Sequence, residues 1–393
     1  MSAAADTIGN GAQGPSASAH AAGLAEYQRA GAERALALGN RGPLKLDGAG
    51  RLDAAIHEAF LEHGFYVFEQ VIDADEIAAL QADALNMIER APVRPGAEVD
   101  AAGRPALGLD YQRCPYRLAR PLSDPWGGTN LLGGRHPHQM TQPRAADSAP
   151  EYVVFVMYAM CEAMPSGLRL YGHHDLLSVA QSINGTDFVP FNDAIFVKQP
   201  GLGASVSWHQ DGVTHWQSPN WDPGIHGFNF QVQLFGASLG NCLWVVPGTH
   251  KLGRIDIKAM IAEHGGSDML PTAVPLQCAP GDVTIVNRQL LHGSFANSSA
   301  DLRVSLTFGF HRRTSVLGAR AALAVESDEI YGEERVFRRS TVIPVAIDAR
   351  AQQFPDEQRF QYAPFAGREH EFRFDAGNFD RYIHDYNVHD LAI

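Results

Sequence analysis

The residue pattern best suited to chemistry is a histidine and an aspartate two positions apart, His209 and Asp211, at the end of a β-rich run that begins at Ala204. Because side chains two apart on a strand point to the same face, this imidazole and this carboxylate can bind one metal ion. A second imidazole can come from His292, which also follows an apolar run. Two histidines and one carboxylate leave about three of six octahedral positions open, which is the ligand set of non-haem Fe(II) oxygenases.

A lone His-x-Asp pair is weak evidence, since the chain has 17 histidines and contains a second pair, His173-His-Asp175. The downstream pair is favoured by Arg303, which follows His292 by eleven residues at the start of the next predicted strand. A guanidinium beside the metal could bind a dicarboxylate through two parallel hydrogen bonds. Nothing equivalent completes the upstream pair, which lies where a helix is expected to begin. We interpret His136-Pro-His138 as loop histidines, because proline breaks the strand that would aim both rings.

The composition is that of an ordinary globular protein, with 393 residues, 45% of them hydrophobic and 19% charged. The net charge of −13 predicts no general attraction to nucleic acid or to anionic lipid. The longest apolar run, residues 152–161, is about half of the ~20 residues needed to span a bilayer, so we expect no membrane partner. The four cysteines form no Cys-x-x-Cys pair, which favours a reducing, cytoplasmic compartment over a disulfide framework or a zinc knuckle.

The elements that must position these residues begin with a helical part. Residues 1–23 are rich in Ala, Ser and Gly and are predicted to form a disordered leader. Apolar residues at helical spacing then predict a helical and loop part over residues 24–190. It contains a long irregular stretch, 92–142, which is our candidate for a lid. Four helices are predicted in this part, over residues 53–63, 73–88, 151–164 and 175–184. A fifth helix, residues 254–264, is predicted further along the chain.

The sequence pattern changes from helical to β-rich in the part that contains the candidate ligands. From about residue 190 to 312 short β-rich runs alternate with Gly, Pro and Asn, and this rhythm predicts a sandwich or barrel. No Gly-rich phosphate loop is present, so a nucleotide-binding fold is disfavoured. The tail, 313–393, has many aromatic residues and weak periodicity, and we expect it to wrap the barrel. Residues 24–393 are therefore predicted to form one domain.

Several motifs occur in a fixed order along the chain. They are Glu62-His-Gly-Phe-Tyr-Val-Phe-Glu, Ser207-Trp-His-Gln-Asp, Asn241-Cys-Leu-Trp-Val-Val-Pro-Gly-Thr-His, Gly281-Asp, His292 and Arg303. Together they resemble the phytanoyl-CoA dioxygenase family of Fe(II)/2-oxoglutarate oxygenases, over about residues 60–312. The resemblance implies a mainly β fold, with a double-stranded β-helix core of the cupin-like jelly-roll type and flanking α-helices. It also implies that His209, Asp211 and His292 bind Fe(II), that Arg303 binds the distal carboxylate of the cosubstrate 2-oxoglutarate, and that O2 is the oxidant.

Further cosubstrate contacts follow less directly from this resemblance. Lys198 matches a basic position that the family often uses near the cosubstrate; the alternative is a solvated lysine at a strand end. The family commonly has Trp on the strand where this chain has Gln231 and Gln233, and either glutamine could take its place. Ser305, two residues beyond Arg303, completes the candidate set.

The function implied by the resemblance is hydroxylation of a small organic molecule or natural product. Desaturation and hydroxylation of an acyl-CoA thioester are alternatives within the same chemistry. A non-catalytic β-barrel that binds a ligand is a rival, and the intact set of His209, Asp211, His292 and Arg303 argues against it. A zinc hydrolase could use the same three ligands, but it gains nothing from Arg303. No motif in residues 92–142 or in the tail selects a particular substrate, and none predicts an oligomeric state.

Overall fold

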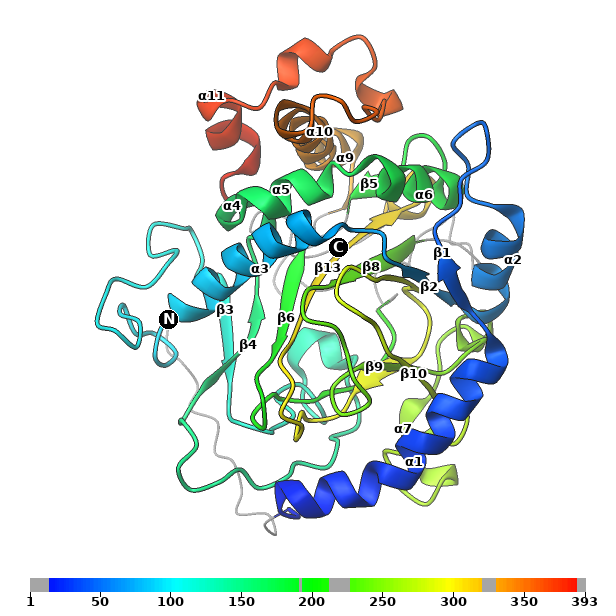
Figure 1. Cartoon of the computed structure of the whole chain (residues 1–393), viewed down its shortest axis with the longest axis vertical. Coiled ribbons are helices and arrows are strands. Elements are labelled where there is room, and N and C mark those ends of the chain that lie inside the picture. The colour runs from blue at the N-terminus through cyan, green and yellow to red at the C-terminus, as the bar shows by residue number, and fades with distance from the viewer. Residues whose placement is uncertain (1–13, 191–192, 212–226, 320–329, 387–393) are drawn as a thin grey trace.

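The computed structural model describes residues 14–190, 193–211, 227–319 and 330–386. Its strands form a large and a small sheet, and helices cover the outer faces (Figure 1). The large sheet has the order β1-β2-β11-β8-β13-β6-β4-β3, and β5 pairs with β13 beside this path. Its strands are β1 (Arg41–Pro43), β2 (Phe65–Glu69), β3 (Tyr116–Ala119), β4 (Val153–Met157), β5 (Val189–Pro190), β6 (Ala194–Lys198), β8 (Gly227–Gln233), β11 (Val283–Asn287) and β13 (Arg303–His311).

The small sheet carries two of the candidate metal ligands. It has the order β10-β9-β12-β7, made of β7 (Val206–His209), β9 (Leu243–Val245), β10 (Val274–Leu276) and β12 (His292–Ser294). In the antiparallel pair of β12 and β7, His292 lies directly opposite His209. Buried side chains of β9 and β10 pack in one cluster with side chains of β2 and β11, so the two sheets share a core. This agrees with the jelly-roll type of fold predicted from the sequence.

Alternation along the central strands decides which side chains reach the interior. In β8, Phe228, Phe230 and Val232 join the core cluster under the helices. The intervening side chains are polar, and Asn229 and Gln231 line an internal cavity. Because side chains alternate between the two faces of a strand, the apolar set packs into the core and the polar set faces the cavity. In β13 the apolar set is Val304, Leu306, Phe308 and Phe310, and the polar set is Arg303, Ser305 and Thr307.

Helices bury the outer face of the large sheet. Asp53 and Asp73 cap the N-termini of α2 and α3 through their carboxylates, as their positions in the sequence predict. The helices of this layer are α2 (Ala54–His63), α3 (Ala74–Glu89), α4 (Met160–Ala163), α5 (Pro165–Tyr171), α6 (His174–Asn184), α9 (Glu333–Ser340) and α10 (Val342–Gln353). In Figure 1, α3, α5 and α6 lie across this face and α10 lies outside them. The tail therefore packs on the helical layer, and α10 contacts α5.

Two helices cover the small sheet instead. The first is α1 (Ala17–Leu38), in which Tyr27 stacks on Trp244 with ring centroids 4.6 Å apart. Gly31 of α1 lies so close to Trp244 that an added Cβ would come within 2.5 Å of the indole. The second is α7 (Ile257–Glu263), whose apolar side chains join the same cluster as Trp208. The two tryptophans are fully buried core residues, as expected.

Two sequence predictions are wrong in this part of the molecule. Residues 17–23 belong to α1 rather than to a disordered leader, because the helix gains a packing partner in Trp244 that composition alone does not reveal. The remainder of the predicted leader up to residue 13 lies outside the described residues. Residues 151–164 hold strand β4 before the short helix α4, since a fully buried run such as Val153–Met157 has the same appearance in a strand and in a helix. Within the described residues, no helix is both long and apolar enough to cross a bilayer.

Candidate metal centre and cavity

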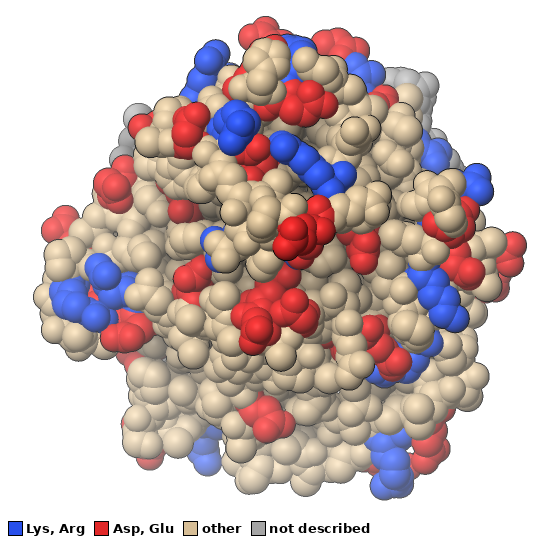
Figure 2. Space-filling model, turned by 45° about the horizontal axis from the view of Figure 1, so that its top comes forward, with Lys and Arg blue, Asp and Glu red and all other residues tan. Residues whose placement is uncertain are grey.

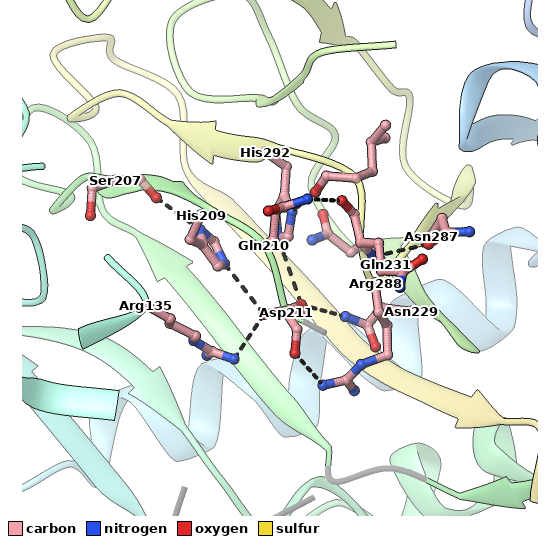
Figure 3. A network of polar contacts seen from close by, with 12 residues as sticks. Arg135, Ser207, His209, Gln210, Asp211, Asn229, Gln231, Asn287, Arg288 and His292 are labelled. Atoms are coloured by element: carbon pink, nitrogen blue, oxygen red, sulfur yellow. Dashed lines mark hydrogen bonds and ion pairs between the residues drawn. The ribbon is translucent and has the colours of Figure 1, made fainter. Parts of the chain in front are cut away.

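Three side chains converge between the two sheets at the ends of β7 and β12. His209 Nε2 lies 3.4 Å from Asp211 Oδ1, and His292 Nε2 lies 3.7 Å from Asp211 Oδ2 (Figure 3). One donor atom from each residue falls within 4.8 Å of the others. The imidazole rings lie side by side, with centroids 4.1 Å apart. The structure thus brings together the three residues predicted to bind a metal.

The backbone fixes the orientation of both imidazoles. His209 Nδ1 lies 2.8 Å from the carbonyl oxygen of Ser207, and His292 Nδ1 lies 2.8 Å from that of Leu290. A carbonyl only accepts hydrogen bonds, so each Nδ1 carries the proton and each Nε2 presents a lone pair toward Asp211. Burial, helped by the neighbouring His209, lowers the pKa of His292 to about 3. His292 is therefore a neutral ligand, and both imidazoles are oriented to offer Nε2 to a divalent metal.

Asp211 is held by partners that the sequence did not suggest. Arg135 Nη1 lies 3.0 Å from its Oδ1, and Asn229 Nδ2 donates to its Oδ2 over 2.9 Å (Figure 3). Burial alone would raise the pKa of Asp211, but Arg135 and the two histidines outweigh it and hold that pKa well below its usual range. The carboxylate is therefore ionised, with both oxygens on the side of the imidazoles.

A strained turn delivers Arg135 to this carboxylate. Leu132, Gly133 and Gly134 all have positive φ angles, of 50°, 66° and 72°. Glycine tolerates that conformation, whereas Leu132 is strained in it. The Gly-Gly pair signals a tight turn in the sequence, but nothing in the sequence links that turn to a residue 76 positions further along.

His136 contributes more than the loop position assigned to it from the sequence. It lies in a loop as expected, yet its buried ring stacks on His209 with centroids 4.1 Å apart. Its Nδ1 lies 3.1 Å from Ser207 Oγ, so contacts from two sides fix the ring. The second histidine of that motif, His138, pairs with Asp268 at 2.8 Å. The loop position of His136 is thus confirmed, and its packing against His209 is a contact between distant segments that the sequence did not suggest.

Arg303 lines the same cavity as the three candidate ligands. Its Nη1 donates to the carbonyl oxygen of Asn241 over 3.1 Å, and its Nη2 donates to Gln231 Oε1 over 3.1 Å and to Ser305 Oγ over 3.2 Å. The residue is only 3% exposed, and no carboxylate pairs with it anywhere in the described part of the chain. A buried guanidinium without an anion is costly unless a ligand supplies one.

The other cosubstrate candidates divide into two groups. Gln231 and Ser305 touch the guanidinium of Arg303, whereas Gln233 is buried outside the cavity lining, so Gln231 is the better of the two glutamines. Lys198 lies opposite Arg303 in the pairing of β6 with β13. Its Nζ donates to the carbonyl oxygens of Ala204 and Phe295 over 2.5 and 2.7 Å, and burial lowers its pKa well below the usual range. The alternative of a solvated strand-end lysine is wrong.

The cavity that joins these groups has a volume of about 230 Å³. Both sheets and the stretch 92–142 contribute to its walls, and part of this stretch is strand β3 of the large sheet rather than an irregular loop. Besides the ligands and Arg303, its charged side chains are Arg113, Arg117, Arg135, Asp193 and Lys198. Its large apolar side chains are Trp126, Leu132, Phe155, Phe196 and Leu243.

A second group of possible ligands lies elsewhere among the described residues, where Glu162, His384 and Asp385 meet. His384 Nδ1 is 2.5 Å from Glu162 Oε1, and its Nε2 is 3.3 Å from Asp385 Oδ2. The upstream His173-His-Asp175 pair forms the start of α6, where the side chain of His173 accepts a hydrogen bond from the amide of Asp175. That pair is a helix cap, in agreement with its predicted place at a helix start.

The comparisons with known proteins agree with the geometry of the site. The sequence pattern of the Phytanoyl-CoA dioxygenase (PhyH) family matches residues 60–305. Phytanoyl-CoA dioxygenase 1 of Oryza sativa subsp. japonica is 32% identical over 116 residues, which are 28% of this chain and 40% of the rice protein. Phytanoyl-CoA dioxygenase of Arabidopsis thaliana is 28% identical over 134 residues, which are 32% of this chain and 45% of that protein. The chain thus matches less than half the length of either relative.

Among solved structures, EctD from S. alaskensis with 2-oxoglutarate and 5-hydroxyectoine superposes with a TM-score of 0.50. The two chains are 19% identical, and the match covers 75% of this chain and 90% of EctD, which supports the fold alone. The family match spans more than half of the chain and includes His209, Asp211, His292 and Arg303. The chain belongs to the phytanoyl-CoA dioxygenase family.

Proposed function

We propose that this member of the phytanoyl-CoA dioxygenase family is an Fe(II)- and 2-oxoglutarate-dependent dioxygenase that hydroxylates a small organic molecule. One observation supports the proposal most strongly. The buried, anion-free guanidinium of Arg303 lines the same cavity as the donor atoms of His209, Asp211 and His292. A hydrolase needs the three ligands but has no use for a buried cation that awaits a carboxylate.

The residues present fit Fe(II). Two neutral imidazole nitrogens and one ionised carboxylate oxygen are the donors that this metal accepts while keeping positions open for other ligands. His209, Asp211 and His292 would bind it, and Arg135 and Asn229 would keep Asp211 in place. When bound, Fe(II) would couple the decarboxylation of 2-oxoglutarate to succinate and CO2 with the activation of O2, and so supply the oxidant for an unactivated C–H bond.

The chain itself orients the cosubstrate and keeps water away. Arg303 would pair with the distal carboxylate through its forked N–H groups, while Gln231 and Ser305 hold the guanidinium plane. Lys198, whose Nζ donates to two backbone carbonyls, lies opposite Arg303 in the sheet and would be a further hydrogen-bond donor near that carboxylate. Apolar walls such as Trp126 and Phe196 exclude solvent, which protects a reactive oxidant from side reactions.

Succinate release tests this proposal. The purified chain should release succinate from 2-oxoglutarate only when both Fe(II) and O2 are present, and Zn(II) should not replace iron. Arg303→Gln should abolish release at moderate 2-oxoglutarate concentration and leave metal binding intact. Metal binding without any succinate release would favour a hydrolase, and the absence of both would favour a ligand-binding barrel. Product mass with 18O2 then separates hydroxylation, which adds one labelled oxygen, from desaturation, which removes two hydrogens.

A further inference from the structure

The charge of the cavity differs from that of the chain. Five cationic side chains line it, namely Arg113, Arg117, Arg135, Lys198 and Arg303, against two carboxylates, Asp193 and Asp211. The cavity is thus formally +3 in a chain of −13. The face in Figure 2 instead shows acidic and basic side chains interspersed, with acidic side chains gathered near its centre. A cationic cavity inside an acidic protein concentrates anions at that one place.

One of these charges has a counterpart in the chain, and two are assigned to the proposed cosubstrate. Arg135 pairs with Asp211, and Arg303 and Lys198 face the cosubstrate position. The carboxylate of Asp193 accepts hydrogen bonds from the backbone amides of Met160 and Cys161 over 3.1 and 3.3 Å, so it is not available to the cavity arginines. Two guanidinium groups are left over, and neither forms an ion pair with any carboxylate of the described chain. They belong to Arg113 and Arg117.

The sheet register separates these two arginines from the cosubstrate position. Arg117 on β3 lies opposite Val156 on β4, and Val156 lies opposite Phe196 on β6. Phe196 in turn lies opposite Ser305 on β13, beside Arg303. Neighbouring strands are about 4.8 Å apart, so three steps place the backbone of Arg117 about 14 Å from that of Ser305. Arg117 thus lies three strands away from Arg303, at a different part of the cavity wall.

Apolar side chains line the wall between the two ends. Phe155 and Phe196 lie edge to face with ring centroids 6.4 Å apart, and Trp126 packs on both of them. The pairing of β3 with β4 is irregular between Arg117 and Leu118, and such a bulge redirects the side chains beside it. Arg117 and Arg113 are exposed at this end, where a molecule entering the cavity would meet them.

We infer that Arg113 and Arg117 bind an anionic head group of the substrate, carboxylate or phosphate, whose apolar body lies along Trp126, Phe155 and Phe196 toward the metal centre. This inference rests on the proposed function and adds the substrate class. Arg117 has a hydrogen bond with Tyr158 but no counter-charge. Two guanidinium groups can bind one oxyanion through several charge-assisted hydrogen bonds, whereas a neutral molecule would leave both charges uncompensated.

The test compares three probes that share one apolar body: 3-phenylpropanoate, 2-phenylethyl phosphate and 3-phenylpropanamide. Calorimetry measures their binding to the full chain loaded with Mn(II) under air-free conditions. At least one anion should bind roughly tenfold more tightly than the amide, as expected for charge-assisted hydrogen bonds. The double variant Arg113→Gln, Arg117→Gln should lose this preference. Arg120→Gln is the matched control, because Arg120 follows the same strand but pairs with Glu151 outside the cavity.

Three outcomes would overturn the inference: equal binding of the amide and both anions, a preference that survives in the double variant, or no binding of any probe to the wild type. The better of the two anions identifies the head group. A titration of 2-oxoglutarate into the same Mn(II) protein tests the proposed function separately, since that binding should depend on Arg303 and be unchanged by the double variant. Unchanged melting temperatures confirm that the variants fold.

Discussion

The described residues contain two groups of histidine and carboxylate side chains. The groups are similar in composition, but their imidazole nitrogens have different partners. In the group of His209, Asp211 and His292, each Nδ1 is bound to a backbone carbonyl and each Nε2 is left facing the carboxylate. In the group of Glu162, His384 and Asp385, one imidazole has a carboxylate at each of its two nitrogens. The first arrangement leaves lone pairs for a metal, and the second uses its imidazole to bridge two acids.

The difference shows that proximity alone does not make a metal site. A carbonyl behind an imidazole fixes its tautomer and frees the other nitrogen, whereas a carboxylate on each side leaves neither nitrogen free for a metal. Figure 3 shows how the first group is enclosed by further polar side chains that hold Asp211. The two groups should therefore respond differently to the same substitutions.

The largest effect is expected from the ligands themselves. His209→Ala, Asp211→Ala or His292→Ala should weaken binding of Mn(II) by more than the roughly 10- to 100-fold typical of losing an outer partner. Anaerobic calorimetry measures this directly, and circular dichroism checks the fold. His384→Ala is the control and should leave the affinity unchanged. Loss of metal binding in that control, with normal binding in the three ligand variants, would reverse the assignment of the two groups.

A large but more selective effect is expected at Arg303. Arg303→Lys replaces a planar fork with a point charge, so the 2-oxoglutarate concentration for half-maximal succinate release should rise by about tenfold or more. Metal affinity should stay within about twofold, because the guanidinium contacts none of the three ligands. An unchanged requirement for 2-oxoglutarate would shift the role to Lys198.

A smaller effect is expected from the side chain that holds Asp211 on one side. Asn229→Ala removes the hydrogen bond to Asp211 Oδ2, and the affinity for Mn(II) should fall about tenfold. Gln233→Ala on the same strand is the matched control, since Gln233 is buried but lies outside the cavity. Equal losses in the two variants would mean that damage to β8, and not to the hydrogen bond, accounts for the change.

The smallest effect is expected in the second group, where the carboxyl proton of Glu162 makes stability depend on pH. Burial raises the pKa of Glu162 from 4.5 to about 7. Between these values the folded protein keeps a proton that the unfolded chain has released, so stability should fall as pH rises through this window. Glu162→Gln removes that contribution. Between pH 5 and 7 the melting temperature of this variant should therefore fall by a few degrees less than that of the wild type. Glu33→Gln, on the exposed face of α1, should follow the wild type; identical curves for all three proteins would contradict the shift.

The sequence is most informative where one strand contains both the hydrophobic alternation and the functional side chains. The alternation of Phe228, Phe230 and Val232 with polar residues is typical of a strand with one core face. The spacing of His209 and Asp211 places both side chains on one face of a strand, and Arg303 distinguishes this pair from the upstream one. Such signals lie within a few residues of each other. They predict a sandwich or barrel and a candidate metal-binding pair, whereas the jelly-roll type and the assignment to Fe(II) come from the resemblance to the family.

Other features depend on contacts between distant segments, and local patterns do not contain them. Arg135 and His136 reach the site from a loop that precedes β7 by about seventy residues, and no periodicity marks them. Helix α1 has a weak amphipathic pattern and is fixed by Trp244. The buried run of β4 fits a strand or a helix equally well until its neighbours are known.

Strand β13 has a consequence for how this protein can be divided. The family match ends at residue 305, inside this strand, although Leu306 to His311 still pair with β8 and in part with β6 and β5. A recombinant fragment cut at those limits would keep every proposed iron ligand and Arg303. It would lose six of the nine residues of β13, together with the cover that α1 gives to Trp244. The matched stretch thus lacks segments that pack on it in the structure, so a loss of activity in such a fragment would be explained by lost packing as well as by lost chemistry.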